Sequence, residues 1–327
     1  MKREGVLVIQ TAFLGDVILT TPLLAALARR HGPVDLITTP AAAVLVETHP
    51  AVRAVIRYDK RGRDRGFTGF FRLVKALRRR GYHRAYLPHR SWRTGALAWL
   101  AGISERIGFS DGSTLLYTTV VDRPPAGHEV ERLLALADPG EEPPVAIALG
   151  AADRLEAESW LGAHGISGEF IALAPGSIWG TKRWPYYGEL AQRLDQPVIV
   201  LGGKEDRALG EEIVAASSGR AKNAAGELSL RGSAALIAKA RLLITNDSAP
   251  LHMATAVGTP IVAIFGPTLP SFGFGPRGPQ DRIVEHHHLA CRPCSSHGPA
   301  VCPLGHHRCM RELGVEVVIE AIERLRN

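Results

Sequence analysis

Short apolar runs alternate with longer amphipathic segments along the chain, and this alternation constrains the fold more than any other feature. Short runs of β-forming residues that alternate with helical segments are typical of a parallel sheet covered by helices. Each half of the chain repeats the pattern, so we predict two α/β domains. The predicted strands, with the turns that follow them, are residues 6–10, 34–38, 54–58 and 85–88 in the first half and 170–176, 198–203, 242–247 and 261–267 in the second.

The segment that joins the two halves predicts the domain boundary. Pro143 and Pro144 introduce a last short strand at residues 145–149, and the next segment has the composition of a connecting helix that ends at Gly165. A chain of 327 residues suits two domains of ordinary size. We expect a ligand cleft between the domains, where the carboxyl ends of their strands face each other. The predicted ranges are 1–150 for the first domain, 151–167 for the connecting segment and 168–327 for the second domain.

The chain is basic, with a formal net charge of +7. This balance favours an acidic partner, which can be nucleic acid, an anionic membrane surface or a phosphorylated small molecule. Nucleic acid is disfavoured because basic and aromatic residues are not interleaved on a recognisable module. No apolar run reaches the roughly 18 residues of a membrane-spanning helix, so a cytoplasmic protein is expected. Arginines cluster in the first half, where a solvated surface is the alternative explanation: Arg61, Arg63, Arg65 and the run Arg78–Arg80.

Two predicted strand-to-helix turns carry polar side chains suited to proton transfer or to anions. After the first strand, Gly15 allows a close backbone approach and Asp16 starts a helix, where it is either a helix cap or a functional carboxylate. After the first strand of the second half, a long loop offers hydroxyls and cations to a phosphate group. A solvated loop with its tryptophans packed inward is the alternative. The loop residues concerned are Ser177, Thr181, Lys182 and Arg183.

The third turn of interest is rich in glycine. Gly202 and Gly203 form a tight turn, and Glu205 or Asp206 then stands where a carboxylate can bind the hydroxyls of a ribose. Neither this turn nor the first contains the spacing G-x-G-x-x-G, which argues against a dinucleotide-dependent oxidoreductase.

The fourth turn, NDSAPLH at residues 246–252, has the composition of an anion-binding helix start. Asp247 or Ser248 is expected to cap the helix, and Pro250 is tolerated because the N–H that it lacks would have no partner within the helix. The free N–H groups and the positive end of the helix dipole favour an anion. His252 lies one turn further on, so we predict a phosphate site with this histidine beside it.

Four segments together resemble glycosyltransferase family 9, the bacterial ADP-heptose:lipopolysaccharide heptosyltransferases. They are FLGDVILTTPLLAAL, PGSIWGTKRWP, AGELSLRGSAALIAKARLLITNDSAPLHMA and GTPIVAIFGPT, in this order within residues 5–276. The KRWP and TNDS-x-x-x-H segments are most similar to the heptosyltransferase II branch. The resemblance implies a GT-B fold of two Rossmann-like domains, with the acceptor bound mainly by the first domain and the nucleotide sugar mainly by the second.

The resemblance also implies roles for individual residues. Asp16 would be the catalytic base, Lys182 would neutralise the diphosphate, Glu205 would hold the ribose and the backbone near Leu228 would meet the adenine. The acceptor would be the phosphorylated inner core of lipopolysaccharide at the inner membrane surface, facing Arg61, Arg63 and Arg65. The complete donor site would comprise Ser177, Thr181, Lys182, Glu205, Leu228, Asp247, Ser248, Ala249 and His252.

The implied reaction explains these residue types. An inverting transfer needs a base for the acceptor hydroxyl and positive charge beside the departing ADP. By the resemblance, Asp16 would provide the base, and Lys182, His252 and the helix start would provide the positive charge, so no metal cofactor is expected for transfer. Two alternatives stay open: a family member with another donor or acceptor, and a non-catalytic relative that binds nucleotide sugars. The presence of both Asp16 and Lys182 argues against the second.

All four cysteines fall within residues 286–312: Cys291, Cys294, Cys302 and Cys309. A C-x2-C pair followed by two more cysteines suits a tetrahedral structural zinc site, in which His297, His306 or His307 can replace one ligand. Disulfides are the alternative, although they are disfavoured in a reducing cytosol, and free thiols are the third possibility. In each case we expect the segment to have a structural role near the ligand cleft.

Overall fold

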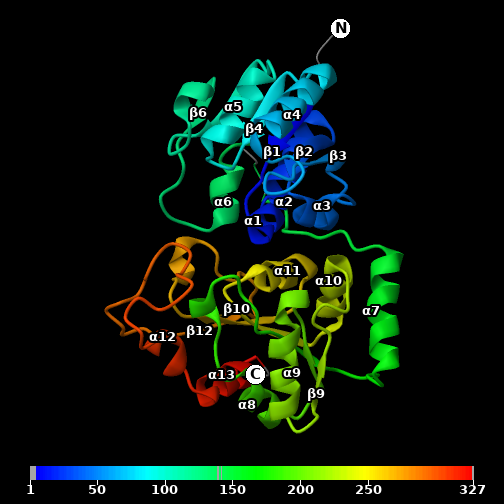
Figure 1. The fold of residues 1–327 in the computed structure, drawn as a ribbon, viewed down its shortest axis with the longest axis vertical. Coiled ribbons are helices and arrows are strands. Elements are labelled where there is room, and N and C mark those ends of the chain that lie inside the picture. The colour runs from blue at the N-terminus through cyan, green and yellow to red at the C-terminus, as the bar shows by residue number, and fades with distance from the viewer. Residues whose placement is uncertain (1–4, 138–139, 141, 326–327) are drawn as a thin grey trace. The chain divides into compact units, whose positions relative to one another are not determined.

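The computed structural model describes residues 5–137, 140 and 142–325, and the chain divides into two compact units, Met1–Ala148 and Leu149–Asn327. Each unit contains one six-stranded parallel sheet with helices packed against it (Figure 1). The predicted α/β fold with two parallel-sheet domains is confirmed. The division after Ala148 lies beside the boundary that the sequence predicts at residue 150.

The sheet of the first unit has the strand order β3-β2-β1-β4-β5-β6, so that β1 lies near its centre. Leu7 of β1 pairs with Asp35 of β2 on one side and with Ala85 of β4 on the other. Its strands are β1 Val6–Ile9, β2 Val34–Thr38, β3 Val52–Arg57, β4 Arg84–Leu87, β5 Glu105–Phe109 and β6 Thr119–Val121. Its helices are α1 Leu14–Leu19, α2 Thr21–His31, α3 Pro40–Val46, α4 Gly66–Arg80, α5 Trp92–Leu100, the 3-10 helix η1 Thr114–Leu116 and α6 Glu129–Leu134.

The sheet of the second unit has the order β12-β11-β10-β7-β8-β9, with Ile244 of β10 paired to Leu173 of β7 and to Val262 of β11. Its strands are β7 Ile171–Ala174, β8 Val198–Val200, β9 Ala221–Asn223, β10 Leu242–Asn246, β11 Ile261–Phe265 and β12 Arg282–Glu285. Its α-helices are α7 Ala151–Ala163, α8 Tyr187–Arg193, α9 Arg207–Ala216, α10 Leu230–Lys239, α11 Ala249–Val257, α12 Arg308–Arg311 and α13 Val315–Glu323. Its 3-10 helices are η2 Gly180–Lys182, η3 Lys204–Asp206 and η4 Pro270–Phe272.

The amphipathic segment after β1 forms two helices: α2 begins at Thr21 with Pro22 in its first turn, and the hydroxyl of Thr20 donates to the carbonyl of Asp16 (2.6 Å) at the break. One local expectation was wrong. Residues 145–149 form no strand: the N–H of Ala146 donates to the hydroxyl of Thr21 (3.0 Å) instead of joining a sheet. The connecting helix is present as α7, and it ends as predicted before Gly165.

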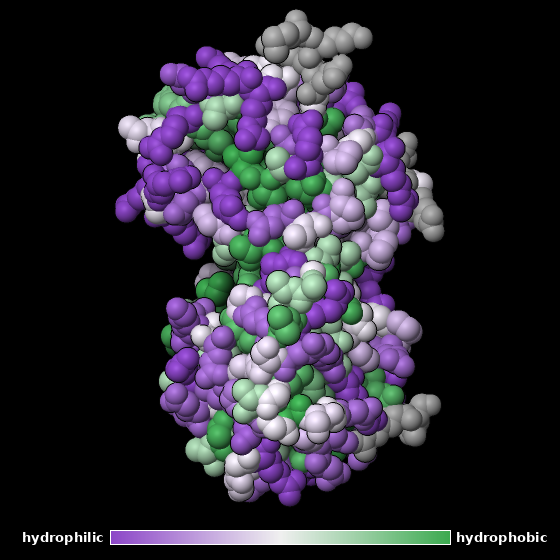
Figure 2. All heavy atoms as spheres, turned by 90° about the vertical axis from the view of Figure 1, so that its right-hand side faces the viewer, coloured by the Kyte–Doolittle hydropathy of each residue, from purple (hydrophilic) through white to green (hydrophobic). Residues whose placement is uncertain are grey.

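Apolar side chains fill the space between each sheet and its helices, and the strands β1, β7, β8, β10 and β11 are buried throughout. On the face drawn in Figure 2, hydrophilic and hydrophobic residues are mixed, with apolar atoms framed by polar ones on the first unit. Within the described ranges, no helix combines the length and the hydropathy that crossing a membrane requires.

The helix that carries His252 ends at Gly258, whose φ of 78° lies in the left-handed region. We expect Gly258→Ala to lower the free energy of unfolding by about 1 kcal/mol, because a Cβ disfavours this backbone conformation although no neighbouring atom blocks it. Gly162→Ala in α7 is the matched control, since its Cβ also meets open space but its backbone is helical, and we expect it to raise the same quantity by about 0.5 kcal/mol. Urea unfolding measures both, and changes of the same sign would contradict the assignment.

Candidate active site

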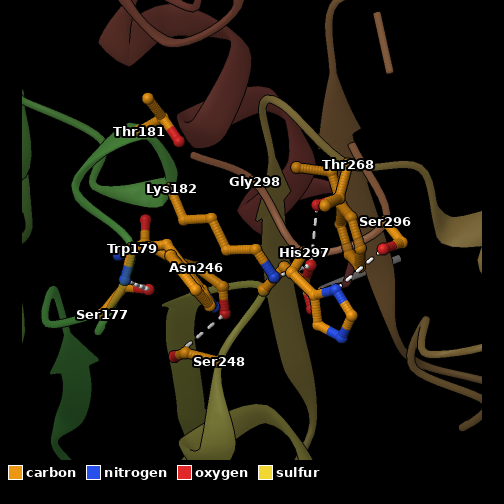
Figure 3. A network of polar contacts seen from close by, with 12 residues as sticks. Ser177, Trp179, Thr181, Lys182, Asn246, Ser248, Thr268, Ser296, His297 and Gly298 are labelled. Carbon is orange, nitrogen blue, oxygen red and sulfur yellow. Dashed lines mark hydrogen bonds and ion pairs between the residues drawn. The ribbon is translucent and has the colours of Figure 1, made fainter. Parts of the chain in front are cut away.

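Polar side chains of the second unit gather where three neighbouring strands end. Strand β10 lies between β7 and β11, and the carboxyl ends of parallel strands share one edge of a sheet. Lys182 follows β7, Asp247 follows β10 and Thr268 follows β11. Figure 3 shows the side chain of Lys182 reaching from η2 toward the end of β10 and toward Thr268.

A buried ion pair forms the centre of this group. The ammonium of Lys182 donates to Oδ2 of Asp247 (2.6 Å), and the hydroxyl of Thr268 donates to the same oxygen (2.7 Å). All three residues are buried. Because a lone buried charge is strongly destabilising, each charge depends on the other. An ammonium has three N–H donors, so Lys182 retains hydrogen-bonding capacity for a bound anion.

Asn246 fixes the loop that carries Lys182. Its amide nitrogen donates to the carbonyl of Pro175 (2.7 Å) at the start of this loop. Its amide oxygen accepts the N–H of Trp184 (3.2 Å) and the hydroxyl of Tyr187 (3.1 Å) at the far end. The side chain is fully buried. Sequence reasoning missed this residue, although a buried amide directly after an apolar strand was visible within NDSAPLH.

The start of α11 differs from the prediction in one respect. Ser248 occupies the N-cap position, but its side chain makes no capping hydrogen bond, and the carboxylate of Asp247 is occupied by Lys182 and Thr268. The expected cap by Asp247 or Ser248 was therefore wrong. Ala249 and Pro250 occupy the first turn as predicted, and His252 is buried one turn later, with its ring 6.3 Å from that of Phe274.

The other predicted donor residues lie at the same edge with different degrees of exposure. Ser177 is partly buried, and its hydroxyl accepts the N–H of Trp179 (3.2 Å). Thr181 is buried, and its hydroxyl donates to the carbonyl of Pro299. Leu228 is partly buried and precedes Ser229, the N-cap of α10.

Of the two candidate ribose carboxylates, Glu205 is exposed, whereas Asp206 is part of its own turn. The carboxylate of Asp206 accepts the N–H of Gly203 (3.0 Å). This arrangement favours Glu205 as the carboxylate available to a ligand.

The four cysteines of residues 286–312 are free thiols in this structure, and the structural zinc stays a prediction. Across residues 5–137, 140 and 142–325, no three His, Cys, Asp or Glu side chains are placed to hold a metal ion, and the four cysteines form no disulfide. The alternative histidine ligands are engaged elsewhere. Nε2 of His307 donates to the carbonyl of Thr181 (2.7 Å), and Nδ1 of His297 contacts the hydroxyl of Ser296 (2.7 Å). Burial raises the pKa of the Cys309 thiol to about 11, so this thiol is protonated near neutral pH.

Arg292 gives this segment a structural role that the sequence did not reveal. Its side chain donates to the carbonyl of Thr268 (2.8 Å), to the carbonyl of Gly266 and to the carboxylate of Glu285 (2.8 Å). The N–H of Cys294 donates to the carbonyl of Pro267 (2.9 Å). The segment thus holds the turn that presents Thr268 to Asp247.

In the first unit, Asp16 lies in the first turn of α1, directly after the central strand β1. Its carboxylate accepts the N–H of Phe13 (3.0 Å), so it is a helix cap, as one of the two sequence interpretations required. Burial raises the pKa of Asp16 to about 6, with a smaller contribution from the nearby negative charge of Glu129. A carboxylate with this pKa suits proton transfer near neutral pH.

Neighbouring loops bring further polar groups to the same edge of the first sheet. The hydroxyl of Thr11 hydrogen-bonds to Nδ1 of His89 (3.0 Å), and the ammonium of Lys60 donates to the carbonyl of Thr11 (2.8 Å). Burial, together with Lys60 and Arg90, lowers the pKa of His89 to about 4, so this imidazole is neutral at pH 7. Sequence reasoning missed Thr11, Lys60 and His89. The predicted acceptor-binding residues Arg61, Arg63 and Arg65 are exposed in the loop between β3 and α4.

Comparison with known proteins identifies the family of the chain that carries these two groups of polar residues. The family model described as glycosyltransferase family 9 (heptosyltransferase) matches residues 70–303, more than half of the chain. The chain belongs to glycosyltransferase family 9. It is therefore an enzyme, and the family resemblance of its sequence is confirmed. The match begins after Asp16, so the role of that residue depends on the geometry described above.

Relatives in this family resemble the chain over most of its length. Lipopolysaccharide heptosyltransferase 2 of Escherichia coli K12 is 29% identical over 298 residues, which cover 82% of this chain and 84% of the relative. A family 9 glycosyltransferase structure from Veillonella parvula matches with a TM-score of 0.84 at 25% identity, covering 99% of this chain and 98% of the other. The structure of E. coli ADP-heptose lipopolysaccharide heptosyltransferase II matches with a TM-score of 0.78 at 25% identity, covering 98% of both chains.

The raised pKa of Asp16 predicts a pH-dependent effect on stability. Between the ordinary value of 3.8 and the folded value of about 6, the folded protein keeps a proton that the unfolded chain has lost, so the stabilisation from this group is lost as the pH rises through this window. We expect Asp16→Asn to raise the melting temperature at pH 7.5 and to have less effect at about pH 3, where the carboxyl is mostly protonated in both states. Calorimetric melts at the two pH values test this expectation, and an equal shift at both would contradict it.

Proposed function

We propose that this family 9 glycosyltransferase transfers heptose from ADP-heptose to the inner core of lipopolysaccharide, with inversion at the anomeric carbon. The observation that carries the proposal is the cluster in which buried Lys182 is paired with Asp247 and Thr268 beside the start of α11. This cluster offers a cation and a helix N-terminus to a diphosphate. The E. coli relative of the same fold is described as an ADP-heptose lipopolysaccharide heptosyltransferase.

In the proposed reaction, Asp16 removes the proton from an acceptor hydroxyl. The acceptor oxygen then forms a bond to the anomeric carbon as the bond between that carbon and the diphosphate oxygen breaks. The electron pair of the broken bond leaves with ADP. A pKa of about 6 leaves Asp16 mostly ionised at pH 7 while keeping it more basic than an exposed carboxylate.

Negative charge develops on the diphosphate as ADP departs, and it is stabilised by positively charged groups that are already in place there. We assign this role to Lys182 and to the N-terminal turn of α11 with Ala249, with His252 behind that turn. Together these groups provide the charge that a divalent metal supplies in other transferases, so we propose that transfer needs no metal cofactor. The structural zinc predicted from the cysteines plays no part in the proposed reaction.

The remaining donor contacts follow from position and exposure. Glu205 is an exposed carboxylate after β8, which suits the hydroxyls of a ribose. Leu228 lies beside the start of α10, where its backbone can meet the adenine. Ser177 and Thr181 belong to the loop that presents Lys182, and Ser248 belongs to the turn that presents Asp247.

The acceptor side of the proposal rests on charge. Arg61, Arg63 and Arg65 form an exposed basic loop in the unit that carries Asp16, and they suit the phosphates of a lipopolysaccharide core. Such an acceptor is anchored in lipid, so we propose a cytoplasmic enzyme with peripheral contact at the inner face of the cytoplasmic membrane.

Asp16→Asn tests the proposed division of roles. We expect kcat for heptose transfer to fall by about 10²–10⁴-fold, the usual contribution of a general base, while the Kd for ADP stays unchanged because Lys182 lies in the other unit. The wild-type kcat/KM is expected to fall as the pH drops below about 6. Asp122→Asn, an exposed carboxylate of the same unit, is the control and should retain activity.

Three results would contradict parts of this proposal. Full activity in Asp16→Asn would exclude Asp16 as the base. A parallel loss of ADP affinity would show that the first unit also binds the donor. A preference of the wild-type enzyme for another nucleotide sugar would retain the fold and the family but remove ADP-heptose as the donor.

A further inference from the structure

Helices α4 and α5 form one layer on the first sheet, because both contribute to the same hydrophobic core. Two hydrogen bonds hold them side by side. Nη2 of Arg93 in α5 donates to the carbonyl of Gly66 at the start of α4 (3.4 Å). Nε of Arg78 near the end of α4 donates to the carbonyl of Leu100 at the end of α5 (2.8 Å). The outer surfaces of the two helices therefore form one continuous face.

Large aromatic side chains lie exposed on this face. Phe67 of α4 is 82% exposed, Phe71 one turn later is 54% exposed, and Trp92 at the start of α5 is 68% exposed. Trp99 follows seven residues after Trp92, on the same side of α5, and is also exposed. Single exposed apolar residues are ordinary on protein surfaces. Four aromatic residues on two adjoining helices are instead a patch, which we call the aromatic–basic face.

The charge around these aromatic residues has one sign. Residues 60–80 contain nine basic residues and a single acidic one, Asp64, which is buried and lies 3.5 Å from Arg72. Neither α4 nor α5 contains an aspartate or a glutamate. Lys75 and Arg78 follow Phe67 and Phe71 at helical spacing, so cations and aromatic rings share one side of α4.

This face lies next to the proposed acceptor site. Helices α4 and α5 begin after β3 and β4, so Phe67 and Trp92 lie toward the carboxyl edge of the sheet, where Asp16 is also found. The loop between β3 and α4 reaches that site directly, because Lys60 donates to the carbonyl of Thr11. A lipid-anchored acceptor bound near Asp16 would therefore be close to this face.

We propose that the aromatic–basic face is the surface through which the enzyme rests on an anionic lipid bilayer. The inference deepens the membrane contact proposed above by assigning it to α4 and α5. Tryptophan and phenylalanine are favoured at the boundary between headgroups and acyl chains. Nearby lysines and arginines add attraction to anionic headgroups. A protein partner fits less well, since charged residues are depleted at the centre of protein interfaces.

Vesicle binding by the full-length enzyme tests the assignment. Co-sedimentation is measured with vesicles of phosphatidylcholine containing increasing fractions of phosphatidylglycerol, at low and high salt. We expect binding to rise with the anionic fraction and to fall with salt. The variant Phe67→Ser/Phe71→Ser/Trp92→Ser is expected to bind at least about tenfold more weakly. The control Leu155→Ser/Ile178→Ser, which removes exposed apolar side chains from the second unit, should bind as the wild type does.

A charge variant separates the basic part of the face from its aromatic part. Lys75→Gln/Arg79→Gln removes two exposed cations of α4 and is expected to weaken binding at low salt. It should have little effect at high salt, where attraction between charges is screened. Wild-type failure to bind vesicles, or equal loss in the control and in the aromatic variant, would overturn the proposal.

Failure of the membrane assignment can be distinguished from failure of the proposed transfer reaction, on which the assignment rests. Transfer to a delipidated, water-soluble acceptor does not require membrane contact, so the aromatic variant should retain it. Loss of transfer to the same acceptor in vesicles, with transfer to the soluble form unchanged, would support the assignment. Absence of transfer to the soluble acceptor in the wild type would instead contradict the proposed function.

Discussion

The buried pair of Lys182 and Asp247 is the interaction on which the rest of the second unit's site depends. Neither charge is stable alone in this interior, because removing one partner leaves the other desolvated and unpaired. The pair forms only when the loop after β7 and the turn after β10 are both held in place. Asn246 holds the loop after β7 by donating to the carbonyl of Pro175. Thr268 holds the turn after β10 by donating to Asp247. The site is therefore a property of three adjacent strand ends.

The cysteine-rich segment, residues 286–312, helps to hold the same loop and turn in place. Arg292 and Cys294 bind carbonyls of the turn that carries Thr268, and His307 binds the carbonyl of Thr181 next to Lys182. The segment thus contributes backbone and arginine contacts beside its four cysteines. The cysteine spacing could not reveal these contacts, because they join segments that are distant in sequence.

Much of the fold was predictable because alternating apolar runs and helices have few stable arrangements. Four strands in each half, the connecting helix and the positions of Asp16, Lys182 and Asp247 at strand ends all followed from this pattern. Strands β5, β6, β9 and β12 were missed. β6 and β9 have only three residues each, and β5 and β12 begin with charged residues that interrupt the apolar pattern. Thr268 and Arg292 were missed because their roles depend on contacts between segments that are distant in sequence. The pKa of Asp16 likewise arises from burial, which its neighbours in sequence do not reveal.

We propose that the Lys182–Asp247–Thr268 cluster holds the diphosphate of an adenine nucleotide. Calorimetric titration of the wild type with ADP and with UDP, repeated for Thr268→Val and Thr268→Ser, tests it most directly. We expect tighter binding of ADP than of UDP. Thr268→Val should bind ADP at least about tenfold more weakly, because it loses the hydrogen bond that orients Asp247 and, through it, Lys182. Thr268→Ser keeps the hydroxyl and should recover the affinity. Equal affinity for the two nucleotides, or unchanged ADP binding in Thr268→Val, would contradict it.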